Sequence, residues 1–403
     1  MKKQKNMVDF LMRKSFLLFA LLILIVTLSL TIKTFVRHKT KVPIVLDQKK
    51  AVSSYPIKRV VLIVQENHSF DSYFGTYPGA DGFDPNTLLP RLPGEKPSIG
   101  LRRTQNTKTP SLRERAYHKD FDTGREDANG MVVMQYFEEK EIPNYWAYAK
   151  NFVLLDRLFS AVRVRYSVPS HFYLIAATAE GWMTNRMEKP YLASKTMIDL
   201  FKEYSISWKL YSGETFNNLT NVPNGFNYIL TFKQHKNDKK VISNIVHRDK
   251  IFKDIKNGTL PQFSWIFPEA EESEHPPQNV RKGMNHVTEV INEIMKSKYW
   301  KDTAIIVIWD DFGGYFDHVK PEITDQFGPG PRVPGLVISA YSKKGYIDHT
   351  TYNTSSVLKF FQTLYNLPSL TERDGKSANM LNAFDFKSGP RDPLILPLIP
   401  VEK

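Results

Sequence analysis

Two short, uninterrupted apolar runs constrain the fold of this chain more than any other feature. They are Val60–Val64 (VVLIV) and Ala304–Trp309 (AIIVIW). Runs of this length that are rich in β-branched residues and show no alternation are typical of strands buried on both faces of a mainly parallel sheet. A third run, Val333–Ile338, has the same character, although its Pro and Gly weaken the expectation of a regular strand.

Helical periodicity falls between and after these runs. We expect helices over residues 143–151, 169–180, 282–298 and 355–366. Strands that alternate with helices predict an α/β fold, here a central mainly parallel sheet between helical layers. The stretch 78–110 is rich in Pro, Gly and Arg and predicts a long surface excursion. No internal repeat or linker divides the body, so residues 58–403 are expected to form one domain.

The N-terminus carries a different signal. Ser15–Ile32 is 18 residues long and has no charge, and the preceding segment 1–14 is basic. At ~1.5 Å per residue a helix of this length nearly spans a hydrocarbon core of about 30 Å. We therefore predict a transmembrane anchor over 15–32, a linker over 33–57, and a body outside the cytoplasm. The alternative is a cleaved signal peptide, which would leave a secreted protein.

The positive charge of the chain is concentrated at this end. The net charge is +13, and residues 1–41 contain nine Lys/Arg and one Asp, a net of +8. The remaining 362 residues then carry 46 minus 41, or +5, which is too little for the concentrated basic surface of a nucleic-acid-binding protein. The chain has no cysteine, which excludes disulfides, thiolate zinc sites and cysteine nucleophiles. Any metal must be held by oxygen or imidazole ligands.

Polar side chains follow both of the first two strands. Glu66 and Asn67 come just after the first, and Asp310 and Asp311 come just after the second. The carboxyl ends of parallel strands meet at the edge of the sheet where α/β proteins bind ligands. Four hard oxygen ligands at one edge predict a divalent-metal site that favours Ca, Mg or Mn over Zn. The alternative is that these residues are ordinary turn formers and helix caps.

The residues around these strand ends resemble a known family. The stretches ENHSFDSYFG (66–75) and WDDFGGYFDHV (309–319) are similar to the bacterial phosphoesterase family, which includes phosphatidylcholine-type phospholipases C and an acid phosphatase branch. Five further blocks agree in order, at residues 142–146, 155–159, 167–173, 274–277 and 338–343. The resemblance covers roughly residues 58–370 and implies an alkaline-phosphatase-like fold acting on phosphate esters or phospholipids.

The resemblance also assigns roles. It places the metal ligands at Glu66, Asn67, Asp310 and Asp311, the nucleophile at Ser167, and active-site histidines at His118 and His275.

The nucleophile position makes physical sense by itself. Ser167 precedes Pro169 and an apolar run, so it is expected near the start of a helix, where the positive end of the helix dipole suits a phosphoryl group. The alternative is a simple N-cap, for which Ser170 competes.

The other histidines have weaker claims. His318 and His349 are second-tier candidates that a supporting or turn role explains equally well. His171 stands four residues after Ser167, but we expect it to face the helix and assign it no role.

Two departures from the family pattern concern the substrate. Residues 353–356 read Asn-Thr-Ser-Ser where relatives often carry Asp-His-Thr-Ser, and residues 169–171 read Pro-Ser-His where relatives often carry Pro-Asn-His or Pro-Asn-Arg. Both the phospholipase C and the phosphatase specificities therefore stay open.

The leading hypothesis is a metal-dependent phosphoesterase that forms a phosphoserine at Ser167. A sulfatase-like or phosphoglycerol-transferring enzyme is an alternative, because the same metal and nucleophile would serve it. A non-catalytic anchored binding protein is another, although a decayed site would be expected to lose some of its ligands.

Overall fold

The two apolar runs form adjacent parallel strands in the computed structural model of the chain. β1 (Arg59–Gln65) pairs with β11 (Thr303–Trp309) along its whole length, from Arg59 opposite Thr303 to Gln65 opposite Trp309. The apolar residues of both strands are buried, as the uninterrupted patterns predict. The structure describes residues 49–86, 88–90, 97–100, 102–104, 134–185, 192–213 and 228–401, and the single positions 12, 24 and 27.

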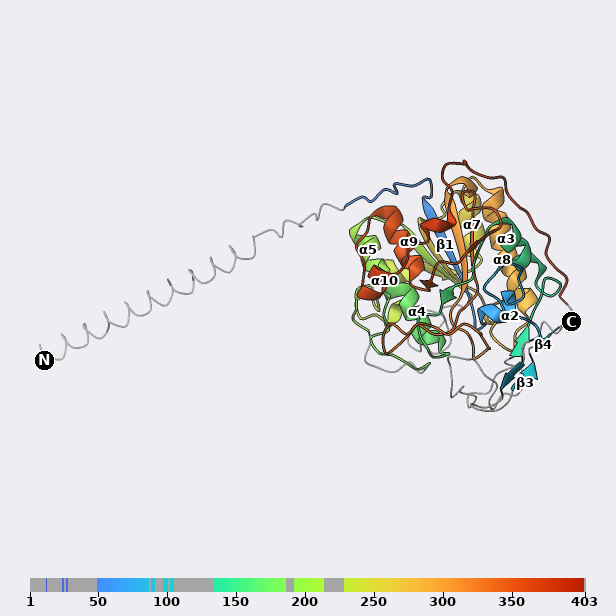
Figure 1. Ribbon diagram of the computed structural model, residues 1–403. Helices are drawn as coiled ribbons and strands as arrows, with labels where there is room; N and C mark the ends of the chain where they lie inside the picture. The colour runs from blue at the N-terminus through green and yellow to red at the C-terminus, as the bar shows by residue number, and fades with distance from the viewer. Residues whose placement is uncertain are drawn as a thin grey trace, which may run out of the picture. The chain divides into compact units, whose positions relative to one another are not determined.

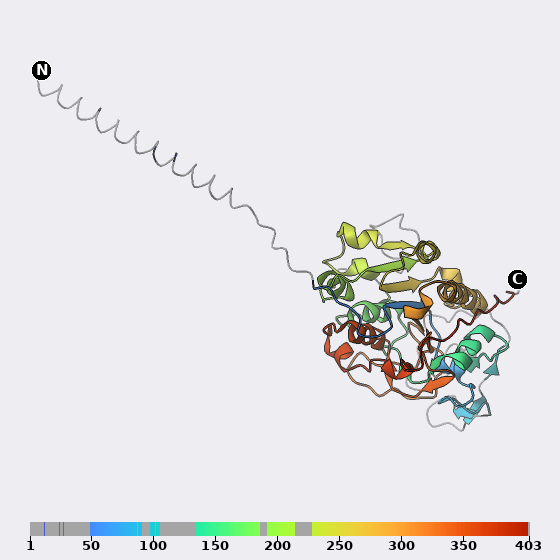
Figure 2. The same cartoon turned by 90° about the horizontal axis from the view of Figure 1, so that it is seen from above.

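The central sheet has eight strands among the described residues, in the order β13-β6-β12-β11-β1-β10-β8-β9. The remaining strands are β6 (Val153–Leu155), β8 (Trp208–Ser212), β9 (Ile245–His247), β10 (Phe263–Phe267), β12 (Gly335–Ser339) and β13 (Tyr346–Asp348). All neighbours are parallel except β12, which runs antiparallel to both β11 and β6. In Figure 2 the yellow-green strands β8 and β9 lie to one side of the blue strand β1. The predicted mainly parallel sheet is confirmed.

Helices cover both faces of the sheet (Figure 1). One layer contains α4 (Ser167–Ala176), α5 (Met197–Glu203), α9 (Ser356–Tyr365) and α10 (Glu372–Lys376). The other contains α3 (Pro143–Asn151), α7 (Lys250–Asn257) and α8 (Val280–Lys296). All four predicted helices are present, with ends shifted by a few residues. The largest shift is in α4, which begins at Ser167 and stops at Ala177, whose left-handed backbone (φ 54°) ends the helix.

Smaller elements lie at the carboxyl edge of the sheet and at the periphery of the body. They are α2 (Phe70–Phe74), α6 (Lys239–Ser243), β7 (Leu158–Phe159), β14 (Tyr352–Asn353), β4 (Arg102–Arg103), β5 (Gln135–Tyr136) and short 3₁₀ turns. Within the stretch expected to be a long surface excursion, β2 (Leu88–Pro90) and β3 (Pro97–Gly100) pair as an antiparallel ribbon. This pairing was not predicted, because local strand pairing is not visible in a pattern so rich in Pro and Gly.

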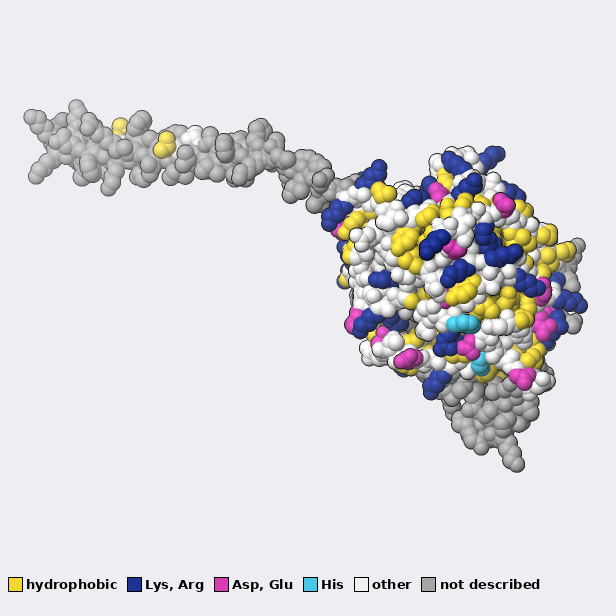
Figure 3. Space-filling model, turned by 45° about the horizontal axis from the view of Figure 1, so that its top comes forward, with side chains coloured by type: hydrophobic (Ala, Val, Ile, Leu, Met, Phe, Trp, Pro, Cys, Tyr) yellow, Lys and Arg dark blue, Asp and Glu magenta, His cyan; other side chains and the backbone are white. Residues whose placement is uncertain are grey.

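Residues 49–403 form one unit by their internal contacts, and residues 1–48 form a second. Apart from Leu24 and Thr27, the predicted anchor lies outside the described residues. Within the part of the chain that is described, no helix is both long and apolar enough to cross a membrane. On the face of the body in Figure 3, Lys and Arg side chains are spread among apolar and acidic ones, as the small net charge of the body predicts.

Candidate active site

Strands β1 and β11 bring four of the predicted ligands together. Because Gln65 lies opposite Trp309, the next residue of each strand, Glu66 and Asp310, leaves the sheet at the same edge. The Asp310 N–H donates to the Gln65 carbonyl at 2.9 Å, and the Asn67 N–H donates to Asp310 Oδ1 at 3.0 Å. The two turns are thus hydrogen-bonded to each other, and Glu66, Asn67, Asp310 and Asp311 are all buried.

Ser167 completes this cluster from helix α4. Its hydroxyl donates to Glu66 Oε2 at 2.9 Å and lies 3.3 Å from Asn67 Oδ1. The helix begins after Tyr166 without any side-chain cap, and the Ser170 hydroxyl donates instead to the Tyr166 carbonyl at 3.1 Å. Neither serine caps the helix, so the capping alternative is wrong for both. The Ser167 hydroxyl is directed at Glu66 and Asn67.

The start of α4 offers fewer backbone donors than a free helix end would. The Val168 N–H donates to Asn185 Oδ1 at 3.1 Å, and the Ser170 N–H donates to the Tyr166 carbonyl. Pro169 has no N–H. The helix therefore contributes the partial positive charge of its dipole next to Ser167 more than a set of open N–H groups.

His171 belongs to the same cluster, contrary to our expectation. One turn after Ser167, its Nδ1 lies 2.8 Å from the Ser167 carbonyl, so Nδ1 carries the proton and the lone pair is on Nε2. Nε2 lies 3.6 Å from Glu66 Oε1. The ring is fully buried and stacks on Tyr228, and burial lowers its pKa, which keeps the imidazole neutral and able to act as a ligand. The i, i+4 spacing from Ser167 was the signal that could have identified it.

Several carboxyl groups are buried next to one another in this cluster, so ionising all of them would concentrate negative charge there. Burial, and then repulsion from Asp310 and Asp311, raises the pKa of Glu66 well above its usual range. Burial and the charge of Asp310 do the same to the pKa of Asp311. The Oδ2 atoms of Asp310 and Asp311 are buried and accept no hydrogen bond from the described residues. A cation would satisfy both the charge and these oxygens.

The donor atoms suit such a cation. Ligand atoms from Glu66, His171 and Asp310 lie within 4.8 Å of one another, and all three residues are buried. The set is oxygen-rich, as predicted, but it includes an imidazole nitrogen, which Mn, Fe and Zn accept more readily than Ca or Mg. The preference for Ca, Mg or Mn over Zn rested on oxygen ligands alone, so it does not carry over to a set that includes an imidazole.

The buried carboxyl of Glu274 connects the ends of β1 and β11. Glu274 accepts hydrogen bonds from the hydroxyls of Tyr73 and Tyr145, both at 2.5 Å, from Gln65 Nε2 at 3.1 Å and from Trp309 Nε1 at 3.2 Å. Gln65 and Trp309 directly precede Glu66 and Asp310. Burial raises the pKa of Glu274 to about 8, against the effect of these four donors.

Only one of the two predicted active-site histidines lies among the described residues. His118 lies outside the described residues. His275 follows Glu274 and is exposed, and its Nδ1 lies 2.7 Å from the Pro276 carbonyl. It adjoins the buried His68, whose pKa is lowered to about 3 by burial and, to a smaller extent, by His275. His275 is therefore near the strand ends and accessible to solvent. Among the described residues, no hydrogen bond joins His275 to Ser167.

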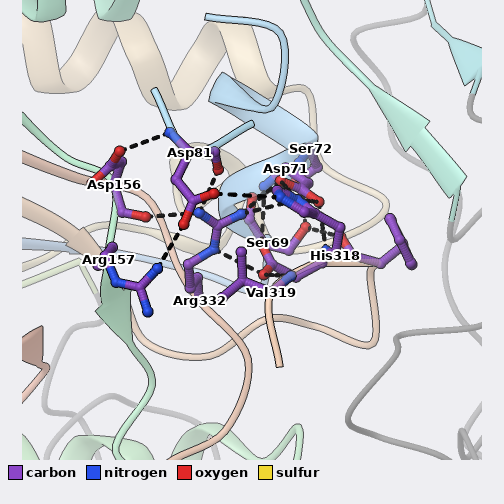
Figure 4. Close-up of polar contacts among 11 residues, drawn as sticks. Ser69, Asp71, Ser72, Asp81, Asp156, Arg157, His318, Val319 and Arg332 are labelled. Carbon is purple, nitrogen blue, oxygen red and sulfur yellow. Dashed lines mark hydrogen bonds and ion pairs between the residues drawn. The ribbon is translucent and has the colours of Figure 1, made fainter. Parts of the chain in front are cut away.

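The second-tier histidines belong to ion-pair networks beside the cluster. Figure 4 shows His318 against Asp71, with Nδ1 2.8 Å from Oδ2, next to the fully buried Arg332. Arg332 donates to Asp71 Oδ1 at 2.8 Å and, through Nε, to Asp317 Oδ1 at 2.9 Å. His349 is mostly exposed, and its Nδ1 lies 2.7 Å from Asp156 Oδ2. Neither histidine contacts Ser167 in the described structure, which agrees with a supporting role.

Comparison with known proteins adds an independent observation. The sequence model of the phosphoesterase family matches residues 57–368. Phospholipase C B of Mycobacterium tuberculosis is 25% identical over 83% of this chain and 78% of its own length. Non-specific phospholipase C1 of Arabidopsis thaliana is 26% identical over 83% of this chain and 72% of its own length. A solved structure of a protein in the alkaline phosphatase superfamily from Vibrio parahaemolyticus is similar at 13% identity, with a TM-score of 0.44 over 85% of this chain and 75% of that one.

Proposed function

The chain belongs to the phosphoesterase family and is a phosphoric ester hydrolase, and from this premise we propose that it acts through a phosphoserine intermediate at Ser167 in a metal-dependent reaction. The observation that carries the proposal is the contact between the Ser167 hydroxyl and Glu66 Oε2 at 2.9 Å. Ser167 is the first residue of α4, one place after the N-cap Tyr166. Its hydroxyl donates a hydrogen bond to a buried carboxyl among the candidate ligands.

Glu66, Asp310 and His171 would hold the cation, with Asn67 and Asp311 beside them. Their buried oxygens and the raised pKa values of Glu66 and Asp311 support this assignment. When bound, a divalent cation would neutralise the carboxylates and stabilise negative charge on the phosphoryl oxygens.

Each proton transfer of the proposed reaction can be assigned to a side chain of this protein. Ser167 Oγ forms a bond to phosphorus while its proton moves to Glu66 Oε2, and the bond from phosphorus to the ester oxygen breaks. The departing alcohol takes a proton from a histidine at the open side of the site, for which His275 and His118 are the candidates. Water then attacks phosphorus and gives a proton to the same histidine, the bond from phosphorus to Ser167 Oγ breaks, and Oγ recovers its proton from Glu66. The helix dipole of α4 favours the negative charge next to Ser167 in both steps.

The relatives direct the choice of substrate. Those named above are phospholipases C, so we propose that a phospholipid phosphodiester is the substrate, with soluble phosphate monoesters as the competing class. The proposed anchor over residues 15–32 would place the body at a membrane outside the cytoplasm, where such lipids are accessible.

The test compares two serines of one helix turn. Replacing the nucleophile in Ser167→Ala should cost at least about 10³-fold in turnover, which corresponds to roughly 4 kcal/mol of transition-state free energy. Ser170→Ala is the matched control, because Ser170 is also buried at the start of α4 but bonds only the Tyr166 carbonyl. With a phosphate monoester as substrate, intact mass after a rapid quench should show a phosphate adduct on the parent and on the control, and none on Ser167→Ala. Near-parental turnover in Ser167→Ala would refute the covalent mechanism.

A further inference from the structure

A small basic pocket lies apart from the carboxylate cluster. Its volume is about 210 Å³, and its walls come from β7, β14, the loop that follows β11, and α10. Its charged lining residues are Arg157, Lys320, Arg373, Lys376 and Glu322, which gives four positive charges minus one negative, or +3. Three of the four cations also pair with acids outside the lining, which are Asp81, Asp325 and Glu372. None of the lining residues belongs to the candidate catalytic cluster.

Polar lining residues of this pocket are hydrogen-bonded to one another. The side chain of Asn353 donates to the Ser377 hydroxyl at 2.9 Å, and that hydroxyl donates to the Arg373 carbonyl at 2.8 Å. The Thr351 side chain and the buried residues Phe159 and Tyr352 also line the pocket. Hydroxyl and amide groups thus line it together with the cations.

The two arginines are held in position by acids outside the lining. Arg157 Nη1 lies 2.6 Å from Asp81 Oδ2, and Figure 4 places this pair at the edge of the network around Arg332. Arg373 Nη2 lies 2.5 Å from Asp325 Oδ2, and its Nη1 donates to the Ala161 carbonyl at 3.0 Å. A guanidinium has five N–H donors, so an arginine anchored by one carboxylate keeps donors for a second anion.

The lysine on α10 is free to turn toward a ligand. Lys376 pairs with Glu372 on the surface of α10, and both side chains are more than three-quarters exposed. Such exposed i, i+4 pairs contribute little stability, so exchanging the partner for another anion costs little.

We propose that this pocket binds a phosphate group, either as the free ion or as the headgroup phosphate of an anionic phospholipid. Cations that approach from several walls, together with the Thr351 hydroxyl, match a tetrahedral anion better than a planar carboxylate. The volume is several times the ~30 Å³ of a water molecule but below the about 300–1,000 Å³ of pockets for drug-sized ligands. It accommodates one oxyanion with a short attached group.

The experiment titrates inorganic phosphate into the full chain in a non-ionic detergent, with EDTA present, at low salt, by calorimetry. Without a cation the candidate catalytic cluster offers no positive side chain to an anion, so the signal reports the pocket. The pocket variant is Lys320→Gln/Lys376→Gln. The control is Lys195→Gln/Lys296→Gln, which removes the same charge from two exposed lysines elsewhere, each paired with a glutamate as Lys376 is.

We expect the pocket variant to bind phosphate at least about tenfold more weakly than the parent, and the control to bind as the parent does. Binding by the parent should also weaken as salt is added. Equal affinity of the pocket variant and the parent, or no binding by the parent at millimolar phosphate, would overturn the proposal.

A second titration with soluble dihexanoyl phosphatidic acid separates the two sources. A lipid ligand should bind the parent more tightly than inorganic phosphate does, and a site for the free ion should bind both alike. In either case the pocket variant must lose the binding, since retained binding would contradict the site.

Discussion

Replacing the buried Glu274 by Gln should change how stability depends on pH. Glu274 is fully buried, and burial raises its pKa from 4.5 to about 8. Between these two pH values the native state keeps a proton that the unfolded state releases. The free energy of unfolding of the parent therefore falls as pH rises through this window, by at most about 1.4 kcal/mol per pH unit and about 5 kcal/mol in total from this group.

Glutamine has the same shape but no titrating proton, so this contribution disappears in the variant. The variant carries its own cost, because an amide oxygen has two lone pairs and the side chain faces four donors, from Tyr73, Tyr145, Gln65 and Trp309. Each buried donor left without an acceptor costs about 1–3 kcal/mol. With two of the four donors unmatched, the variant should be less stable than the parent at pH 5 by about 2–6 kcal/mol, and this deficit should shrink by about 3–4 kcal/mol between pH 5 and pH 8.

The assay is urea unfolding of the full chain and of Glu274→Gln, followed by tryptophan fluorescence in one detergent at intervals from pH 5 to pH 9. The quantity that matters is the parent value minus the variant value at each pH, because titrating groups common to both proteins cancel in it. A difference that stays constant across this range would refute the reasoning, since Glu274 would then be ionised at pH 5 already.

Three further outcomes test the site and its setting. Asp310→Asn should reduce both bound divalent metal and turnover, measured by elemental analysis and by hydrolysis of a generic phosphate ester after chelation and refilling, and unchanged values would remove Asp310 from the ligands. His171→Ala should weaken metal binding, whereas His349→Ala, a change at an exposed ring, should not; equal effects would exclude His171 as a ligand. The segment Ser15–Ile32 should keep the chain in the membrane fraction with its body open to external protease, and recovery of a soluble protein that begins near residues 33–45 would show a cleaved signal instead.

The fold was predictable where a local pattern determines the element. Val60–Val64 and Ala304–Trp309 are uninterrupted apolar runs, and each forms a strand buried on both faces. Such a pattern carries no direction, however, and β12 proved to be the antiparallel strand of the sheet. β6 and β8 were not predicted, because Val153–Leu155 is only three residues long and Trp208–Ser212 mixes Lys and Ser with apolar residues. Their strand state depends on pairing with distant segments.

The candidate site was predictable to the extent that it depends on strand ends. Glu66 and Asp310 could be placed at one edge because both follow buried parallel strands. His171 could not be separated from a core histidine, because its ring does pack against Tyr228 and Phe267 while its edge reaches Glu66. A buried position and a ligand position coincide here, and only the three-dimensional arrangement shows both.

The orientation of the ligands depends on an interlock between two turns that no local pattern predicts. Asn67 has a left-handed backbone, with φ 58°, a region in which Asn is one of the few side chains that occur with any frequency. In this conformation its N–H points at Asp310 while its side-chain oxygen lies beside Ser167. Gly313 packs against this turn so closely that a Cβ there would lie 2.2 Å from the Asn67 carbonyl oxygen. Any larger residue at 313 would push the Asn67 turn away from Asp310. The sheet thus brings the candidate ligands to one edge, and the absence of a side chain at Gly313 allows the two turns to approach closely enough for the ligands to face one another.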